Sequence, residues 1–142
     1  MSGEGSYEGV QVSVQIGDRM EDGTVYAGIS PDTHEPMYAT PNDAPLTYTF
    51  DQAKEYGTKL GAHGHKDWCV PTKAELNVLF QNRGTIDGFN ETGAYPSGWY
   101  WSSSQDDGYA AWAQRFSDGV QSGDAEDHVS SLRCIRRVKR RE

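Results

Sequence analysis

Two cysteines, Cys69 and Cys134, have the most distinctive chemistry in this 142-residue chain. No Cys-x-x-Cys spacing is present, so they do not form a zinc or redox motif of that kind. A disulfide between them would close a loop of about 65 residues and would stabilise the fold by about 4 kcal/mol. Two separate buried thiols are the alternative, because unpaired cysteines are common in protein cores. The sequence leaves both alternatives open.

Two histidines, His63 and His65, lie two residues apart in the segment AHGHKD and precede Asp67. Side chains of these types bind metal ions, but a stable site needs three or four ligands held together. Histidines at this spacing on a loop more often stabilise a turn. We therefore predict a structural role for this segment and no metal site.

Three consecutive serines, Ser102 to Ser104, are the residues that most suggest a nucleophile. A serine becomes a nucleophile only when a base activates it, and nothing nearby in the sequence supplies one. The chain also lacks a Gly-rich phosphate loop, an HExxH motif and a G-x-S-x-G motif. The sequence therefore predicts no catalytic residues and a protein that is not an enzyme.

Aromatic and polar residues alternate in the segment at 99–119. Trp99, Trp101, Trp112 and Phe116 have the spacing of residues that face a core along their strands. Tyrosine offers a large rigid contact and small polar groups adapt their hydrogen bonds, so the residues around these rings suit a binding surface. Ordinary polar surface is the alternative. The residues predicted to face outward are Gln105, Asp106, Asp107, Tyr109, Gln114, Ser117, Gln121, Ser122 and Asp124.

Two helices are predicted to support this segment, at 50–60 and 73–82. Thr49 with Gln52, and Thr72 with Glu75, have the three-residue spacing of a capping box at the start of a helix. Apolar residues then recur at the three- and four-residue spacing of a buried helix face. Gly61 ends the first helix.

Short strands are predicted on both sides of the two helices. Residues 10–16 alternate strictly between apolar and polar, which indicates a half-buried strand that pairs within this chain or with a neighbouring subunit. Further strands are expected at 24–30, 36–40, 99–103, 111–117, 119–123 and 131–138. This order predicts an α+β fold, with two helices packed on short antiparallel sheets and a loop-rich C-terminal half. We divide the chain into an N-terminal arm at 1–21, one domain at 22–138 and a basic tail at 139–142.

Charge is distributed unevenly along the chain, which carries a net charge of −8. The last ten residues hold six of the 13 basic residues and one of the 21 acidic residues. An acidic body repels nucleic acid, so we expect no nucleic-acid partner. The basic end either binds an acidic partner or offsets the charge of the body.

No apolar run is long enough for a membrane span, and the first residues do not resemble a signal peptide, so we expect a chain made in the cytoplasm.

Several motifs resemble the C-terminal domain of the Legionella collagen-like adhesin. KDWCVPTKAELNVLF at 66–80 is similar to that family's D-W-R-L-P-T-x-x-E-L motif, although Cys69 replaces its arginine. YWSSS, AWAQRFSDG and SLRCIRRV follow in the family's order, so the resemblance covers roughly residues 22–138. It implies a C-type-lectin-like fold, related to retroelement-diversified variable proteins and to formylglycine-generating enzymes. In the variable proteins the last strands and loops carry the ligand surface.

The resemblance also implies expectations about ligands. Sugar-binding C-type lectins hold calcium with Glu-Pro-Asn and Trp-Asn-Asp motifs, but this chain has Glu35-Pro36-Met37 instead. No cofactor is therefore expected. A calcium site is the alternative, because Ca²⁺ binds oxygen ligands. The acidic residues that could form it are Asp106, Asp107, Asp118, Asp124, Glu126 and Asp127.

The function that the resemblance favours is a non-enzymatic adhesin or receptor-binding domain. We expect it on a phage virion or a cell surface, where it would bind a surface glycan or protein and form a homo-oligomer such as a trimer. A structural decoration or fibre subunit, held in its assembly by the strand at 10–16, is the alternative. An enzyme of the formylglycine-generating type is a third hypothesis, which the absence of paired active-site cysteines disfavours.

Overall fold

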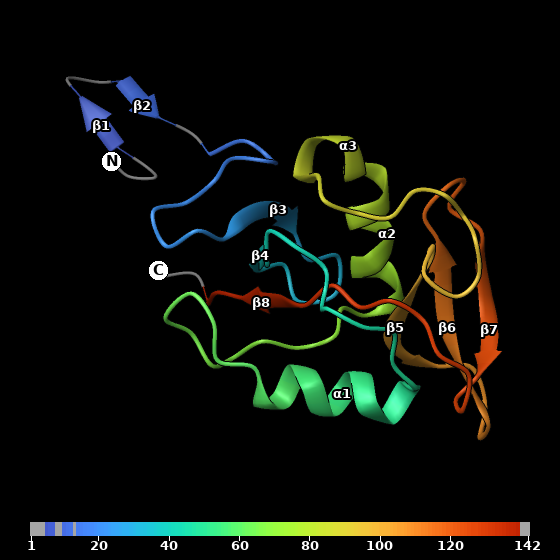
Figure 1. The fold of residues 1–142 in the computed structure, drawn as a ribbon. Helices are drawn as coiled ribbons and strands as arrows, with labels where there is room; N and C mark the ends of the chain where they lie inside the picture. Colours follow the sequence, from blue (N-terminus) through green and yellow to red (C-terminus); the bar gives the residue numbers. More distant parts are fainter. Residues whose placement is uncertain (1–4, 8–9, 13, 140–142) are drawn as a thin grey trace.

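The computed structural model describes residues 5–7, 10–12 and 14–139. Three helices and two three-stranded sheets form the body of the chain (Figure 1). All strands within these sheets pair antiparallel. The predicted α+β class is therefore confirmed, and the arrangement is consistent with a C-type-lectin-like fold.

The two predicted helices are present and begin where their caps indicate. Helix α1 (Phe50–Lys59) follows Thr49, and helix α2 (Lys73–Gln81) follows Thr72. At each start the threonine side chain accepts a hydrogen bond from the third helical residue, whose own side chain binds the cap's backbone N–H. Both capping boxes are thus complete, which satisfies backbone donors that would otherwise lack partners.

A third helix, α3 (Arg83–Ile86), lies in the segment that was predicted to be loop. The backbone N–H groups of Thr85 and Ile86 donate to the carbonyl of Asn82, the residue that directly follows α2. Ile86 is buried in the core and supplies a reason for this turn to form. Four residues are too few to show a helical period, so the sequence pattern gave no signal for it.

The first body sheet brings together segments far apart in the sequence. It consists of β3 (Val25–Ile29), β4 (Pro36–Ala39) and β8 (Ile135–Arg137) in the order β3-β4-β8. Cys69 extends the sheet beyond β8, because its backbone exchanges hydrogen bonds with Ile135. The closing strand β8 therefore lies between β4 and the segment that leads into α2.

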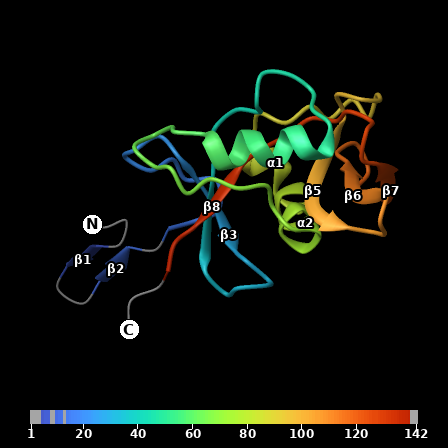
Figure 2. The same ribbon diagram turned by 90° about the horizontal axis from the view of Figure 1, so that it is seen from below.

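The second body sheet carries most of the residues predicted to bind a ligand. It consists of β5 (Trp99–Gln105), β6 (Ala110–Arg115) and β7 (Gln121–Ala125) in chain order, which leaves β7 at an edge. The register pairs Trp101 with Ala113 and Ala113 with Ser122. In Figures 1 and 2 this sheet lies to one side of the two long helices.

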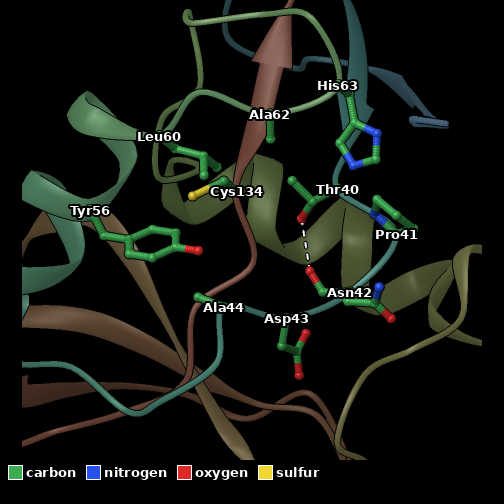
Figure 3. Close-up of a pocket in the computed structure, with 10 residues that line it drawn as sticks. All are labelled: Thr40, Pro41, Asn42, Asp43, Ala44, Tyr56, Leu60, Ala62, His63 and Cys134. Atoms are coloured by element: carbon green, nitrogen blue, oxygen red, sulfur yellow. Dashed lines mark hydrogen bonds between the residues drawn. The ribbon is translucent and has the colours of Figure 1, made fainter. Parts of the chain in front are cut away.

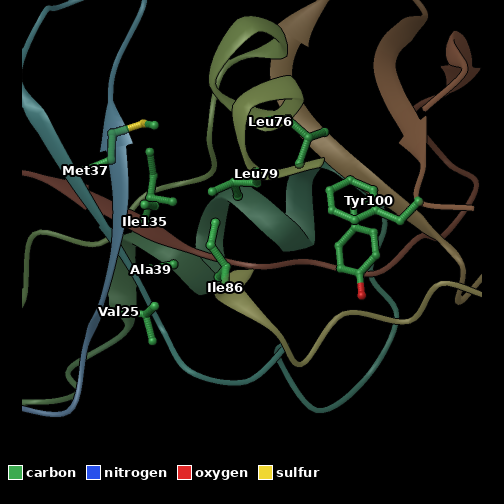
Figure 4. Packing of buried hydrophobic residues seen from close by; sticks show 10 residues of the cluster. Val25, Met37, Ala39, Leu76, Leu79, Ile86, Tyr100 and Ile135 are labelled. Atoms are coloured by element: carbon green, nitrogen blue, oxygen red, sulfur yellow. The ribbon is translucent and has the colours of Figure 1, made fainter. Parts of the chain in front are cut away.

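The core has two parts, one on each long helix. The first contains Leu76 and Leu79 of α2, packed with Tyr100, Phe116 and residues of the first sheet (Figure 4). The second contains Phe50 of α1 with Trp101 and other residues of the second sheet. Strand β5 contributes alternate residues to the two parts, as expected from the alternation of side chains along a strand.

The N-terminal segment forms a hairpin instead of the single strand predicted at 10–16. Strand β2 (Val10–Val12) pairs antiparallel with β1 (Gly5–Tyr7). Residue 13 lies outside the described residues, and residues 14–16 are not in a strand. Ile16 packs instead against the first core part, close to Gly28 of β3. The apolar alternation thus serves two local roles: a hairpin and a contact with the body.

Three arginines at the end of the chain are paired with carboxylates of the body. Arg133 binds Asp43 at 2.8 Å, Arg136 binds Asp67 at 2.7 Å and Arg137 binds Glu75 at 2.6 Å. Half of the basic residues in the last ten positions therefore neutralise internal carboxylates. For these three the structure supports the interpretation in which the basic end offsets the charge of the body.

Candidate ligand-binding face

The tip of the β5–β6 hairpin is the most exposed part of the predicted binding surface. Asp107 Oδ1 accepts hydrogen bonds from the backbone N–H groups of Tyr109 at 2.8 Å and Ala110 at 3.0 Å. The turn is therefore held by its own side chain, a common use of aspartate in turns. The Tyr109 side chain extends from this fixed turn and is 86% exposed. Gln105, Asp106 and Asp107 are exposed beside it.

A second group of polar residues lies beside the tip of this hairpin, where the Glu126 backbone N–H donates to the Tyr109 carbonyl. Gln105 Nε2 donates to Glu126 Oε2 at 2.8 Å, which links β5 to the segment after β7. Asp124 Oδ1 lies 2.8 Å from His128 Nδ1, and the His128 ring contacts Tyr95 edge-on. Sequence reasoning missed Tyr95 and His128 as parts of this face. Tyr95 comes from a loop without a periodic pattern, and only the tertiary fold brings it here.

Gln114 is not on the surface, which corrects the prediction that it faces a ligand. Its side chain is fully buried and donates to Asn77 Oδ1 of α2 at 2.9 Å and to the Gly119 carbonyl at 3.0 Å. It shares strand parity with Trp112 and Phe116, so it lies on the face of β6 that α2 covers. Gln114 therefore connects the sheet to α2.

The remaining predicted residues are divided between the two faces and two ends of the sheet. Gln121 is half-buried beside α2 and donates to the Lys73 carbonyl at 3.1 Å. Ser122 is exposed on the opposite face from Gln121, and Asp124 lies on the same face as Ser122. Ser117 is exposed in the β6–β7 turn, at the far end from the hairpin tip. The predicted set therefore does not form one continuous surface.

The aromatic residues predicted to form the core are buried to different degrees. Trp101 and Phe116 are fully buried, whereas Trp99 and Trp112 are half-buried. Lys73 Nζ lies 3.5 Å from the centre of the Trp112 ring, in a cation–π arrangement. Trp112 thus packs against the start of α2 and is only partly within the core.

The serine run has a structural role. Ser102 Oγ donates to the Trp112 carbonyl at 2.7 Å, across the irregular part of the β5–β6 pairing. Ser104 Oγ accepts from the backbone N–H of Lys73 at 3.0 Å. Neither hydroxyl is hydrogen-bonded to a histidine or a carboxylate among the described residues, so no activated nucleophile is formed there.

The two histidines hold one loop against another. His63 Nδ1 lies 2.9 Å from the Asp22 carbonyl, and His65 Nε2 lies 2.8 Å from the Asp22 carboxylate. Burial opposes ionisation of Asp22, but hydrogen bonds from the Thr24 backbone and from His65 lower its pKa to about 2. The predicted structural role therefore has a defined partner in Asp22.

Four of the six acidic residues considered for calcium, Asp107, Asp118, Asp124 and Glu126, bind neighbouring protein groups. Asp118 pairs with Arg115 at 2.6 Å, and Asp124 and Glu126 bind His128 and Gln105 as described above. Over residues 14–139 no three His, Cys, Asp or Glu side chains are arranged as a metal-binding group.

The two cysteines are free thiols that point to opposite sides of the closing strand. Cys69 is paired with Ile135 and packs with it against the first core part, whereas Cys134 lies in the second. Neighbouring residues on a strand face opposite ways, so this geometry disfavours the disulfide and the paired catalytic cysteines alike. Burial raises the pKa of Cys134 to about 12 and also raises that of Cys69. Neither thiol is activated as a nucleophile.

The residues that carry the family resemblance form the frame around this face. Trp68 is buried and its ring N–H donates to the Ala62 carbonyl at 3.1 Å. Thr72 caps α2, and Glu75 of the same motif is fully buried against Arg137 of β8. The shared motif therefore specifies folding contacts, whereas Tyr109 and the hairpin tip lie outside it.

Comparison with known proteins identifies the family of this frame. The family model of the Lcl C-terminal domain matches residues 29–136, which is most of the chain. A search of curated proteins finds no match. None of the helices that the structure describes has the length and apolar character needed to cross a membrane. The matched family is adhesin-like and is not a known enzyme family. With its fold and motifs arranged as described, the chain belongs to the Lcl C-terminal domain family.

Proposed function

We propose that this chain is a non-enzymatic ligand-binding domain of the adhesin or receptor-binding type. Its ligand would be a glycan or protein on a cell surface. The observation that carries the proposal is the β5–β6 hairpin tip, where Tyr109 is 86% exposed on a turn fixed by Asp107. An exposed aromatic side chain on a rigid turn binds with little loss of conformational entropy.

The frame below the hairpin supports this role. Trp101 of β5 is fully buried, and its ring N–H donates to the Tyr48 carbonyl at 2.6 Å. The hairpin therefore projects from a strand whose position is fixed by the core. A binding surface that is already ordered loses little free energy when the ligand arrives.

The setting that we propose is the surface of a phage virion or of a cell, where the chain would act as a homo-oligomer among other surface subunits. The net charge of −8 disfavours a nucleic-acid partner. The adhesin-like family supports a surface role. No step of this proposal requires a cofactor.

Binding to a panel of intact bacterial cells and immobilised surface glycans tests this function. The double variant Tyr109→Ala with Gln105→Ala should lose at least about tenfold in affinity for any target of the wild-type protein, because an exposed tyrosine anchor contributes 2 kcal/mol or more at many interfaces. The melting temperature should stay unchanged, since both side chains are exposed. Ser117→Ala, at the other end of the sheet, is the matched control. Equal binding by the double variant and the wild type would exclude the hairpin as the binding face.

A structural role in an assembly is the second candidate function. Strands β1 and β2 pair with each other, and Figures 1 and 2 show them apart from the two body sheets. Such a hairpin has open edges that a neighbouring subunit can pair with. Removal of residues 1–13 should then reduce the mass measured by light scattering while the body stays folded. An unchanged mass would argue against assembly through the hairpin.

A further inference from the structure

Two hollows adjoin each other along α1, away from the β5–β6 hairpin. The inner pocket, of 150 Å³, lies between Tyr56 of α1, Asn42 and the turn at His63 (Figure 3). The outer groove, of 610 Å³, continues along α1 past Leu46. Tyr56 and Leu60 line both hollows, which therefore adjoin at these side chains, and we refer to the two together as the depression.

The inner pocket contains polar groups with unused hydrogen-bonding capacity. Among the described residues, no hydrogen bond is made by the Tyr56 hydroxyl or by the Asn42 side-chain amide. His63 contacts the Asp22 carbonyl through Nδ1 at 2.9 Å, so this contact leaves its other ring nitrogen, Nε2, available. Figure 3 shows the Tyr56 hydroxyl directed toward the space that Asn42 and His63 border on the other side. The Tyr56 hydroxyl, the Asn42 amide and a ring nitrogen of His63 thus converge, as ligand hydroxyl groups require.

Charge around the depression is balanced. The Asp43 carboxylate at the floor accepts from Arg133 Nε at 2.8 Å and also from the Tyr100 hydroxyl. At the rim, Lys59 pairs with Glu55 at 2.8 Å. Among the residues that the structure describes, no unpaired cation lines either hollow, and the chain as a whole is acidic, so an anionic ligand would be disfavoured.

The lining of the outer groove is mixed, with the rings of Tyr48 and Tyr56 and the side chains of Leu46 and Leu60 beside polar and charged residues. Tyr48 and Tyr56 contact each other with ring centres 5.3 Å apart, and Leu46 nearby is 68% exposed. Tyr48 is buried and its hydroxyl accepts from the Leu46 backbone N–H at 3.2 Å, so the half-buried Tyr56 supplies the ring face that can stack on the apolar C–H face of a sugar. The volume of the groove lies within the range typical of small-molecule sites.

We propose that this depression binds a neutral saccharide, with one sugar in the inner pocket and the next along the Tyr56 ring toward Leu46. The observations that favour this ligand class are the convergent neutral polar groups, the balanced charge and the Tyr56 ring. The site does not involve the hairpin tip, so it stands or fails independently of the function proposed above.

The test is a titration of the full chain, followed by two-dimensional ¹H–¹⁵N NMR. The probes are neutral oligosaccharides of two to four units built from glucose, galactose, mannose or N-acetylglucosamine. At least one probe should shift the backbone amides of Asn42, Tyr56, Leu60 and His63 and leave that of Tyr109 in place. Tyr56→Phe and Asn42→Ala each remove one hydrogen-bonding group and should weaken this binding about fivefold to tenfold. The spectra themselves show whether each variant is folded.

Tyr109→Ala is the matched control and should bind the same probe as tightly as the wild type. A probe that carries a carboxylate or sulfate group on the same sugars should bind more weakly. The proposal is overturned if no neutral probe shifts these amides at millimolar concentration, if the shifts persist in both variants, or if the anionic probe binds more tightly. Cell binding by a wild-type protein that binds none of the neutral probes would overturn only this inference and not the hairpin's role.

Discussion

Glu75 is a fully buried carboxylate that the chain keeps ionised. Both of its oxygens accept from Arg137 at 2.6 Å, Ser30 donates at 2.5 Å, and the backbone N–H of Thr72 donates at 2.9 Å. Burial alone would raise the pKa of this carboxyl, but the hydrogen bonds from Arg137 and Ser30 outweigh it and lower the pKa. A bidentate pair of this kind stabilises the fold only while both partners are present.

Replacement of Glu75 by glutamine should therefore destabilise the domain by about 3 kcal/mol, because Arg137 is left without a counter-charge. Urea unfolding measures the effect. Asp67→Asn is the matched control, since Asp67 faces Arg136 in a similar bidentate geometry but has a side chain that is 53% exposed. Its cost should stay below about 1 kcal/mol. Equal losses in the two variants would contradict the distinction between the buried and the exposed pair.

The lowered pKa of Glu75 also predicts how stability depends on pH. A carboxyl whose folded pKa is depressed contributes stability that is complete above its unfolded pKa, close to 4.5. That stability is lost as the pH falls through the folded pKa. Asp22 adds to the same trend down to about pH 2. The free energy of unfolding should therefore fall steadily below pH 4.5. Glu75→Gln should flatten this acid limb, and an unaltered slope would show that other groups cause it.

Residue roles could be predicted where local pattern decides them. Asp107 and Tyr109 were expected to be exposed, and they are, because the turn between two strands must lie outside the sheet. Gln114 was placed outside because it is polar, although its parity matches Phe116. Its burial depends on Asn77 of α2, a partner 37 residues away. No pattern within one strand indicates which face a helix will cover.

The long helices show how far element prediction reaches. Their starts at Phe50 and Lys73 followed directly from capping boxes, which act over three residues. Strand positions were also close to those predicted, but their partners were not evident from local patterns. The order β3-β4-β8, for example, joins segments about 100 residues apart. The N-terminal alternation likewise gave a strand without revealing that β1 would be its partner.

The two helix caps, Thr49 and Thr72, should differ in how much they stabilise the fold. Thr49→Ala removes one capping bond and should cost about 1 kcal/mol. Thr72→Ala should cost more, because its hydroxyl also donates to Asp32 in the loop after β3. Thermal unfolding of the two variants, with Thr58→Ala on the exposed face of α1 as the control, measures the difference. A larger effect at Thr49 would show that the contact with Asp32 contributes little.

At the scale of the whole molecule, the family's D-W-x-x-P-T-x-x-E-L motif and the proposed binding face concern different residues, although the family match at 29–136 spans both. The matched motif supplies Trp68, Thr72 and Glu75, all of which hold the fold together. The exposed residues at the hairpin tip and beside Tyr56 depend on loops between these fixed points. The family could therefore be predicted from the sequence, whereas the ligand depends on loop residues whose positions only the structure provides.

Truncation tests how far the whole fold depends on β8. A chain ending after residue 131 lacks Arg133, Arg137 and the strand that pairs with β4, and it should fail to fold cooperatively. A chain ending after residue 139 keeps these contacts and should unfold at nearly the wild-type temperature. Circular dichroism during heating measures both. Cooperative unfolding of the shorter chain would show that β8 is dispensable.

The late position of β8 also sets the order of events during synthesis. Glu75 leaves the ribosome 62 residues before Arg137, and Asp43 leaves 90 residues before Arg133. Helices α1 and α2 can form while the chain is still growing, but the first sheet and its buried ion pair cannot. Until β8 has been synthesised, the apolar side of β4 and the unpaired Glu75 carboxylate stay accessible to chaperones. Translation speed near the codons for β8 would therefore influence how much of this protein reaches its native state.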